Sequence, residues 1–332
     1  MLRIGTLGSS RISQPALIEP ADSVPEVTVA AVAARDMARA EAYALRHGLE
    51  RAYGSYEELL ADPDIDAVYN PLPNSLHGPW TLRAIEAGKH VLCEKPFASN
   101  ADEAAQVAQA ASASGLVVME AMHYRYHPLT QRLTEVVGEL GPVRHIQAWT
   151  SFAIVDPGDI RYDYSLAGGA MMDGGCYAID CLRLLGGDKP SVTGALADPV
   201  DSGAVPEAAD RSLAVQLAFP SGATGWFESS FTRDGAFRAD LHVICEDGLV
   251  HLDNFIFPGR GRLTATRDGA MVADEEGSGE STYVYQLRAF AAAIASGEPV
   301  PTSAASALVT MRLIDDAYRA AGLAPRPAGA RA

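Results

Sequence analysis

Short apolar runs alternate with segments of helical length through the first part of the chain. The apolar runs fall at residues 2–7, 27–32, 66–69, 89–93 and 116–119. The segment 37–47 has the composition of a helix, and Ser55-Tyr56-Glu57-Glu58 has the pattern of a helix start. Strands and helices that alternate at this spacing predict a doubly wound parallel sheet with helices on both faces. We therefore expect a first, α/β domain at residues 1–122.

The pattern changes after residue 143. Strand-like runs then follow at 144–153, 191–197, 211–219, 223–231, 237–245 and 248–256. Phe219-Pro-Ser-Gly222 and Cys245-Glu-Asp-Gly248 have the composition of hairpin turns. Successive strands at hairpin spacing predict a large, mainly antiparallel sheet.

Helices complete the second part of the chain. We expect them near residues 283–296 and 303–321, which gives an α+β domain at 123–322, followed by a disordered Pro/Ala tail at 323–332. A sheet covered by one helix leaves its other face open, and a second copy of the chain is the simplest cover. The sequence therefore predicts a homodimer or homotetramer that forms through the open sheet face.

The stretch at residues 166–185 predicts a helix that begins after Gly168-Gly169. Asp173 and Tyr177, four residues apart, would share one face of that helix. Gly174-Gly175 lies between them, and two glycines inside a helix cost about 2 kcal/mol relative to alanine. Such a cost indicates that something approaches the backbone closely. One interpretation is a phenol and a carboxylate presented to a ligand, and the other is a capped core helix with a half-buried tyrosine.

The totals narrow the classes of function. The chain has 332 residues, of which 48% are apolar, and a formal net charge of −16, which argues against nucleic acid or an anionic membrane as partners. The four cysteines form no C-x-x-C motif and no zinc-type His/Cys spacing, so we expect free thiols and no metal site. No apolar run has the length of a membrane span and no signal peptide is evident, which predicts a cytoplasmic protein.

Polar residues follow several of the predicted parallel strands. The first strand runs into Gly8-Ser9-Ser10-Arg11-Ile12-Ser13, a turn typical of pyrophosphate binding, although only Gly8 keeps a glycine of the G-x-G-x-x-G pattern. A plain strand-to-helix turn is the alternative. Arg35 follows the second strand, where an arginine accommodates the 2′-phosphate of NADP. The adjacent Asp36 argues weakly for NAD, because an acidic residue near this position bonds the ribose 2′-hydroxyl of NAD. Asn74 and Lys95 follow later strands, and together these strand ends predict a dinucleotide site.

Four segments of the chain carry a resemblance to a known family. They are Pro71-Leu-Pro-Asn-Ser-Leu-His77, Glu94-Lys95-Pro96, Glu120-Ala-Met-His-Tyr-Arg-Tyr-His-Pro128 and the run from Gly168 to Tyr177. They resemble the Gfo/Idh/MocA oxidoreductases, and the similarity runs from Leu2 to about Gly322. The resemblance implies a Rossmann domain, an open-faced α+β domain, and hydride exchange between NAD(P) and a CH–OH group.

The branch that this chain resembles has tyrosine where inositol dehydrogenases have histidine. It includes D-xylose and glucose–fructose type enzymes, dimeric dihydrodiol dehydrogenases and sugar 3-ketoreductases. Ala170, in place of a third glycine, and the serines of the first turn depart from the family pattern.

The resemblance also implies roles for individual residues. Lys95, Tyr177 and Asp173 would be catalytic, with Lys95 and Tyr177 in neighbouring roles that handle the proton. The cofactor would be NADP, with NAD as the alternative, and its contacts would be Gly8, Ser9, Ser10, Arg11, Ile12, Arg35, Pro71, Leu72, Asn74, His77, Glu94 and Lys95. A carbohydrate or polyol substrate would contact Lys95, Arg161, Tyr162, Asp173, Tyr177 and Asp180. Two other functions stay open: an NAD(P)-binding sensor without turnover, and a glycoside-cleaving relative that uses redox chemistry transiently.

Overall fold

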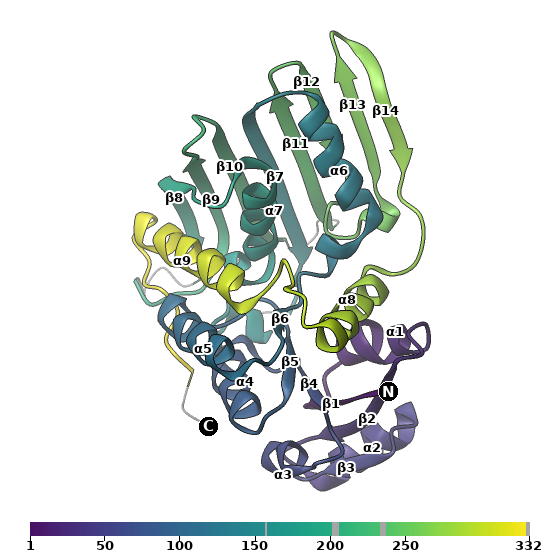
Figure 1. Cartoon of the computed structure of the whole chain (residues 1–332). Coiled ribbons are helices and arrows are strands. Elements are labelled where there is room, and N and C mark those ends of the chain that lie inside the picture. Colours follow the sequence, from purple (N-terminus) through teal and green to yellow (C-terminus); the bar gives the residue numbers. More distant parts are fainter. Residues whose placement is uncertain (157, 201–205, 233–236, 330–332) are drawn as a thin grey trace. The chain divides into compact units, whose positions relative to one another are not determined.

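The computed structural model describes residues 1–156, 158–200, 206–232 and 237–329. The chain divides into two compact units, shown in Figure 1. Unit 1 comprises Met1–His123, Tyr283–Leu308 and Ala328–Ala332, and unit 2 comprises Tyr124–Thr282 and Val309–Pro327. Within the described ranges, no helix combines the length and the apolar composition that a membrane crossing requires.

Unit 1 is built on a six-stranded parallel sheet with the strand order β3-β2-β1-β4-β5-β6. Its strands are β1 (Leu2–Leu7), β2 (Val27–Ala33), β3 (Arg51–Tyr53), β4 (Ala67–Asn70), β5 (His90–Cys93) and β6 (Val118–Glu120). This is the order of dinucleotide-binding folds, in which the connections reverse direction between β1 and β4. The predicted doubly wound sheet is confirmed.

Three helices of unit 1, α2, α3 and α5, begin at side chains that accept hydrogen bonds from backbone amides. Asp36, Ser55 and Asn100 each accept from the amide three residues further on, which satisfies one of the free donors of a helix start. The helices are α1 (Glu19–Ala21), α2 (Met37–His47), α3 (Tyr56–Ala61), α4 (His77–Glu86), α5 (Ala101–Ser114) and α8 (Thr282–Ser296). The segment after the first turn is a short π-helix, Gln14–Ile18.

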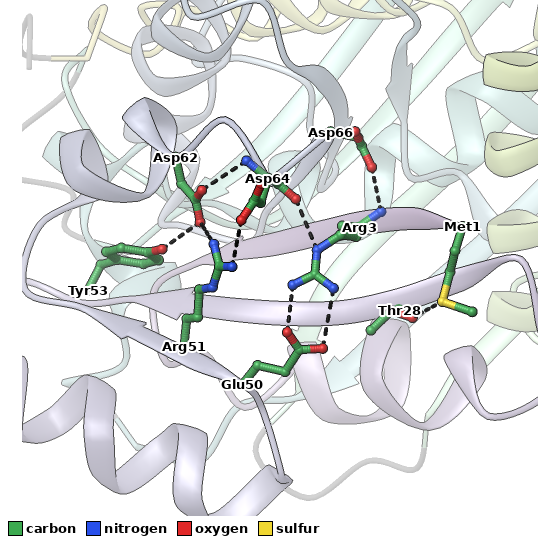
Figure 2. A network of polar contacts seen from close by, with 9 residues as sticks. All are labelled: Met1, Arg3, Thr28, Glu50, Arg51, Tyr53, Asp62, Asp64 and Asp66. Carbon is green, nitrogen blue, oxygen red and sulfur yellow. Dashed lines mark hydrogen bonds and ion pairs between the residues drawn. The ribbon is translucent and has the colours of Figure 1, made fainter.

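A network of charged side chains joins segments of unit 1 around the amino ends of the strands (Figure 2). Arg51 binds Asp62 and Asp64, each at 2.6 Å, and Arg3 binds Glu50 at 2.6 Å. Burial of Asp62 opposes its ionisation, but hydrogen bonds from Tyr53, the Asp64 amide and Arg51 outweigh it and lower the pKa of the carboxyl from 3.8 to about 2. Because the network lies at the amino ends of the strands, the carboxyl ends remain available for binding a ligand.

Unit 2 contains an eight-stranded sheet with the order β14-β13-β12-β11-β7-β10-β9-β8. The strands are β7 (Val143–Ala153), β8 (Ser191–Pro199), β9 (Asp210–Ala218), β10 (Thr224–Thr232), β11 (Arg238–Cys245), β12 (Gly248–Leu252), β13 (Arg262–Arg267) and β14 (Ala270–Glu276). The predicted mainly antiparallel sheet is confirmed. One pairing differs from the expected succession of hairpins: β7 lies between β10 and β11 and runs parallel to β10.

Two strands of this sheet were not predicted. β13 and β14 pair across a turn at Asp268-Gly269, where both residues have positive φ values of 52° and 79°. Asp-Gly is a strong sequence signal for such a hairpin turn. The signal was present in the sequence, but the apolar residues after the turn, Ala270-Met271-Val272, are consecutive and exposed, so β14 lacks a clear apolar alternation.

Helices cover one face of the sheet in unit 2. They are α6 (Pro128–Glu139), α7 (Cys176–Gly186) and, from residue 309, α9 (Ala304–Ala320), and Figure 1 shows α6 and α7 lying against the strands. Side chains of β11 alternate: Leu241 and Val243 are buried, whereas Asp240, His242 and Ile244 between and beside them are partly or largely exposed. The opposite face of the sheet is therefore open within this unit.

The expected disordered tail is wrong for the part that the structure describes. Arg326 is fully buried and binds Asp210 at 2.5 Å, and its Nε donates to the Gly168 carbonyl at 2.6 Å. Composition alone suggested disorder because prolines and alanines surround this arginine. Residues 330–332 of the predicted tail lie outside the described residues.

Candidate functional site

In unit 1 the loops that follow β1 and β4 meet at the carboxyl edge of the sheet. Gly8 has a positive φ of 88°, and its amide donates to the Ala33 carbonyl at 2.7 Å. A Cβ at Gly8 would lie 3.1 Å from Cδ2 of Leu72, so the two loops approach each other closely. Ligands of this fold bind at the edge where the connections reverse. The predicted residues Gly8 and Leu72 are therefore placed together there, with Pro71 beside Leu72.

An open pocket of about 440 Å³ lies beside the first turn. Ser9, Ser10 and Arg11 line one side, and Arg39 and Arg46 of α2 line the other. The Nε of Arg39 donates to the Ser9 hydroxyl at 2.6 Å, and the Tyr43 hydroxyl donates to the Ser10 carbonyl at 3.1 Å. Three arginines around one pocket stand out in a chain with a net charge of −16. Such a pocket fits an anionic group such as a phosphate.

Arg35 lies in the exposed turn after β2, close to the same edge. Burial raises the pKa of the Tyr56 hydroxyl, while the positive charges of Arg35 and Arg39 act in the opposite direction, so both guanidinium groups lie near it. A Cβ at Gly8 would lie 3.7 Å from the same hydroxyl. Asp36 turns its carboxylate to the start of α2, where it accepts from the Arg39 amide at 2.9 Å. The Asp36 carboxylate, which argued weakly for NAD in the sequence, thus caps the start of α2.

His77 connects the loops that follow β4 and β5. Its Nδ1 lies 2.6 Å from the Pro96 carbonyl and its Nε2 lies 2.7 Å from the Leu72 carbonyl. Burial, which outweighs these hydrogen bonds, lowers the pKa of His77 to about 4, and the charge of Lys95 acts in the same direction. A neutral ring donates from one nitrogen only, so it satisfies one of the two carbonyls at a time. The ring holds the Lys95-Pro96 loop against the loop of Leu72.

The loop after β5 presents a partly buried lysine. Lys95 precedes Pro96 across a cis peptide, and Glu94 is buried and accepts a hydrogen bond from the Tyr69 hydroxyl at 2.7 Å. Asn74 begins a short 3₁₀ turn before α4. Of the predicted cofactor residues, Glu94 and His77 are interior groups that shape this edge, whereas Arg35 and Lys95 retain exposure.

In unit 2 the helix that carries Asp173 and Tyr177 starts as a π-helix. Residues Met171–Gly175 are π-helical and α7 continues from Cys176, so the helix predicted after Gly168-Gly169 is present and its first turn is π-helical. Single π-turns within helices occur frequently at functional sites. Tyr177 is 4% exposed, and its ring meets the Tyr124 ring edge-on with centroids 6.1 Å apart.

The glycines of this helix approach the sheet. A Cβ at Gly174 would lie 2.7 Å from the Ser229 hydroxyl of β10 and 2.8 Å from both Phe152 and Thr150 of β7. A Cβ at Gly175 would collide with the Met171 side chain of the same helix. The close approach that the sequence indicated is therefore made by the protein interior.

Asp173 is held in place by an ion pair. The Nε of Arg161 donates to Oδ2 of Asp173 at 3.0 Å, and its Nη1 donates to Asp159 at 3.2 Å. The attraction of Asp173, with that of Asp159, outweighs burial and raises the pKa of Arg161. Tyr162 donates its hydroxyl to the Ile154 carbonyl at 3.0 Å. The structure thus brings together two of the predicted substrate contacts, Arg161 and Asp173. Pro157, in the loop that carries Arg161, lies outside the described residues.

Asp180 has protein partners that the sequence analysis missed. It is 2% exposed, accepts from the Tyr124 hydroxyl at 2.6 Å, and pairs with Arg125 at 3.1 Å. This burial and pairing speak against the predicted contact of Asp180 with a substrate hydroxyl and favour an interior role. His127 accepts from the Leu129 amide at 3.1 Å and so caps the start of α6.

Residues that line the arginine-rich pocket were only partly foreseen. Arg39, Tyr43 and Arg46 lie on one face of α2 because they are spaced by four and three residues. That spacing was readable in the sequence, but a surface helix with arginines is common and the pattern gave no reason to single it out.

Comparison with known proteins identifies the family. Residues 2–122 match the family described as "Oxidoreductase family, NAD-binding Rossmann fold", and residues 131–251 match the GFO/IDH/MocA C-terminal domain. The chain belongs to the Gfo/Idh/MocA oxidoreductase family. Membership confirms the predicted resemblance and the prediction of an NAD(P)-dependent oxidoreductase that acts on CH–OH groups.

Relatives of this Gfo/Idh/MocA oxidoreductase span nearly its whole length. D-xylose 1-dehydrogenase (NADP(+)) 2 from Haloferax volcanii is 40% identical over 96% of this chain and 97% of the relative. The crystal structure of KijD10, a 3-ketoreductase from Actinomadura kijaniata in complex with NADP and TDP-benzene, superposes with a TM-score of 0.87 at 27% identity, covering 97% of this chain and 98% of that one. Aldose-aldose oxidoreductase from Caulobacter crescentus superposes with a TM-score of 0.86 at 27% identity, over 96% and 97% of the two chains.

Proposed function

We propose that this protein exchanges a hydride between NADP(H) and a carbinol or carbonyl carbon of a sugar or sugar-like polyol. The observation that carries the proposal is the pair of Asp173, on the π-helical turn, and Tyr177, at the start of α7, in a chain 40% identical to an NADP-dependent D-xylose dehydrogenase. The arginine-lined pocket at the edge of the parallel sheet supports the cofactor, because a dinucleotide brings phosphates to that edge.

The proposed chemistry assigns one proton to the protein. When bound, NADP(H) accepts or supplies the hydride at the nicotinamide ring. In the oxidative direction, the substrate hydroxyl gives its proton to the Tyr177 phenolate as the C=O bond forms, and in the reverse direction the phenol returns it. An unperturbed phenol titrates near 10, so a positive charge is required to make the phenolate available near neutral pH. Lys95 is the residue to which we assign that charge, or a hydrogen bond to the same substrate oxygen.

Asp173 and Arg161 are proposed as substrate contacts. The Asp173 carboxylate accepts the Nε–H of Arg161 at 3.0 Å, which fixes its orientation. A carboxylate held in this way accepts hydrogen bonds from neighbouring sugar hydroxyls. Tyr162 extends from the same loop and completes the set that we assign to the sugar.

A panel of aldoses and ketosugars, assayed with both cofactors by the absorbance of the reduced nicotinamide, tests the proposal. We expect turnover with at least one sugar, and Tyr177→Phe should lower kcat by roughly 10²–10⁴-fold with unchanged NADP affinity. Tyr164→Phe is the matched control, because its hydroxyl donates to the Pro325 carbonyl of the same unit. Cofactor binding without turnover on any sugar would favour the sensor. Tightly held NAD without net reduction would favour the glycoside-cleaving relative. Unchanged turnover in Tyr177→Phe would refute the role of this phenol.

We also propose a homodimer or homotetramer that forms through the open face of the eight-stranded sheet. Leu196, Ile244, Leu249 and Met271 expose between 42% and 76% of their surface there, which is a large apolar area to leave in water. Light scattering that finds a monomer at micromolar concentration would contradict the proposal.

A further inference from the structure

Two histidines and an aspartate meet on the open face of the sheet in unit 2. His242 of β11 lies directly opposite His251 of β12 in the antiparallel register, and Asp240 precedes His242 by two residues. Residues two apart on a strand share a face, and opposite residues of an antiparallel pair are neighbours. The three side chains therefore project from the same patch.

The distances within this cluster are those of potential metal ligands. Nε2 of His251 lies 2.6 Å from Oδ1 of Asp240, and Nε2 of His242 lies 3.6 Å from Oδ2. One ligand atom from each residue lies within 4.8 Å of the others. Tetrahedral zinc with bonds of about 2.0–2.2 Å holds its ligands about 3.3 Å apart, so small rotations suffice. The two imidazole rings stack with their centroids 4.3 Å apart, and their side chains are 45% and 40% exposed.

The surroundings prepare the carboxylate for an ion. Arg238 donates to Oδ2 of Asp240 at 2.8 Å, and Oδ1 lies 2.6 Å from Nε2 of His251, so a bound ion would replace this second hydrogen bond. The guanidinium of Arg238 stacks over the Trp149 ring, 4.4 Å from the centroid. Hydrogen bonds of this kind orient ligating carboxylates in metal sites.

We propose that Asp240, His242 and His251 bind a divalent transition-metal ion of the zinc class. Two imidazoles and one carboxylate are the donors that zinc selects, whereas calcium and magnesium prefer oxygen ligands alone. All three ligands come from one chain, so the site does not depend on a partner. The fourth position faces outward and takes water or a group from a molecule that covers this face. The site lies on the open face of the sheet, whereas α7 with Tyr177 covers the opposite face. Its spacing, Asp-x-His plus a histidine on the next strand, differs from the short zinc motifs.

Zinc titration of the chelator-treated protein by calorimetry tests the site. We expect one Zn²⁺ per chain, and a loss of affinity of at least about tenfold to hundredfold in each of His242→Ala, His251→Ala and Asp240→Asn.

His145→Ala is the matched control. His145 lies on the same face in β7, where its Nδ1 is bonded to the Thr224 hydroxyl at 2.6 Å. This variant should bind zinc as the wild type does. Thermal unfolding with chelator present establishes that each variant is folded. A wild type that binds no zinc at micromolar concentration, or zinc binding that survives both histidine variants, overturns the proposal.

Discussion

Replacing the buried Arg326 by alanine should destabilise unit 2 more than any ordinary surface change. Three nitrogens of Arg326 reach the Gly168 carbonyl, the Ala208 carbonyl and the Asp210 carboxylate at 2.6, 3.1 and 2.5 Å. The guanidinium also lies over the Tyr318 ring, 4.0 Å from its centroid. The variant removes all of these contacts and leaves Asp210 charged in the interior.

The loss of stability in Arg326→Ala depends on the hydrogen bonds that Asp210 keeps in the variant. Breaking a fully buried ion pair typically costs 3–5 kcal/mol, because the remaining charge is desolvated without its partner. Asp210 still accepts from the Tyr318 hydroxyl at 2.8 Å and from the Met171 amide at 2.7 Å. These donors place the expected loss at the lower end, about 3 kcal/mol. For a domain of this size, that loss lowers the melting temperature by about 6–12 °C.

Scanning calorimetry of the wild type and variants measures this loss. Arg144→Ala is the matched control, because Arg144 is exposed and pairs with Glu246 on the surface of unit 2, where such pairs contribute about 1 kcal/mol or less. The double variant Asp210→Asn, Arg326→Ala should lose less stability than the sum of the single changes, since the orphaned charge is gone. If Arg326→Ala melts within about 2 °C of Arg144→Ala, the reasoning from burial is refuted.

Three further changes test other parts of the structure. Arg35→Ala should weaken NADP binding by about ten- to hundredfold and leave NAD binding unchanged, measured by fluorescence titration, and equal losses for both cofactors would contradict the assignment. Asp62→Asn should lower the melting temperature at neutral pH. Because the pKa of Asp62 is lowered in the folded state, its contribution to stability is present above pH 3.8 and is lost as the pH falls towards about 2. The difference in melting temperature between Asp62→Asn and the wild type should therefore vanish near pH 2. A difference that persists at this pH would contradict the network of Figure 2. Gly174→Ala should cost about 1–3 kcal/mol through overpacking, whereas Gly138→Ala in α6, with open space around it, should not destabilise, and similar effects of both would exclude a close contact at Gly174.

The first unit could be predicted from the sequence because its signals are local. Apolar runs, helix caps such as Ser55 and regular spacing fix each strand and helix, and the connection rules of parallel sheets then order them. The predicted helix at 37–47 and the strand at 2–7 have the observed bounds of α2 and β1. Which side chains gather at the sheet edge follows from the same rules, since the strand ends lie together.

The second unit was less predictable because its specific features depend on distant partners. The parallel pairing of β7 with β10 joins segments about 80 residues apart, and no local pattern encodes it. Asp180 was expected to face a ligand, yet Tyr124 and Arg125, more than 50 residues earlier, take its carboxylate. Arg326 pairs with Asp210 across more than 100 residues of chain. Each of these contacts forms only after the tertiary fold exists, so the periodicity and composition of the sequence do not predict it.

The glycines around Asp173 show how one sequence signal can support two different conclusions. Gly169 has a φ of 133°, and a side chain there would collide with Asp210 and Arg326, while a side chain at Gly174 would collide with Ser229, Phe152 and Thr150. Both glycines are therefore explained by packing inside unit 2, with no ligand required. The two glycines allow the helix to pack closely against the sheet, and this position of the helix sets the direction of Asp173 and Tyr177. The functional argument consequently rests on the chemistry of these two side chains, the Arg161 pair and the family, and a Gly174 variant tests the positioning separately from the chemistry.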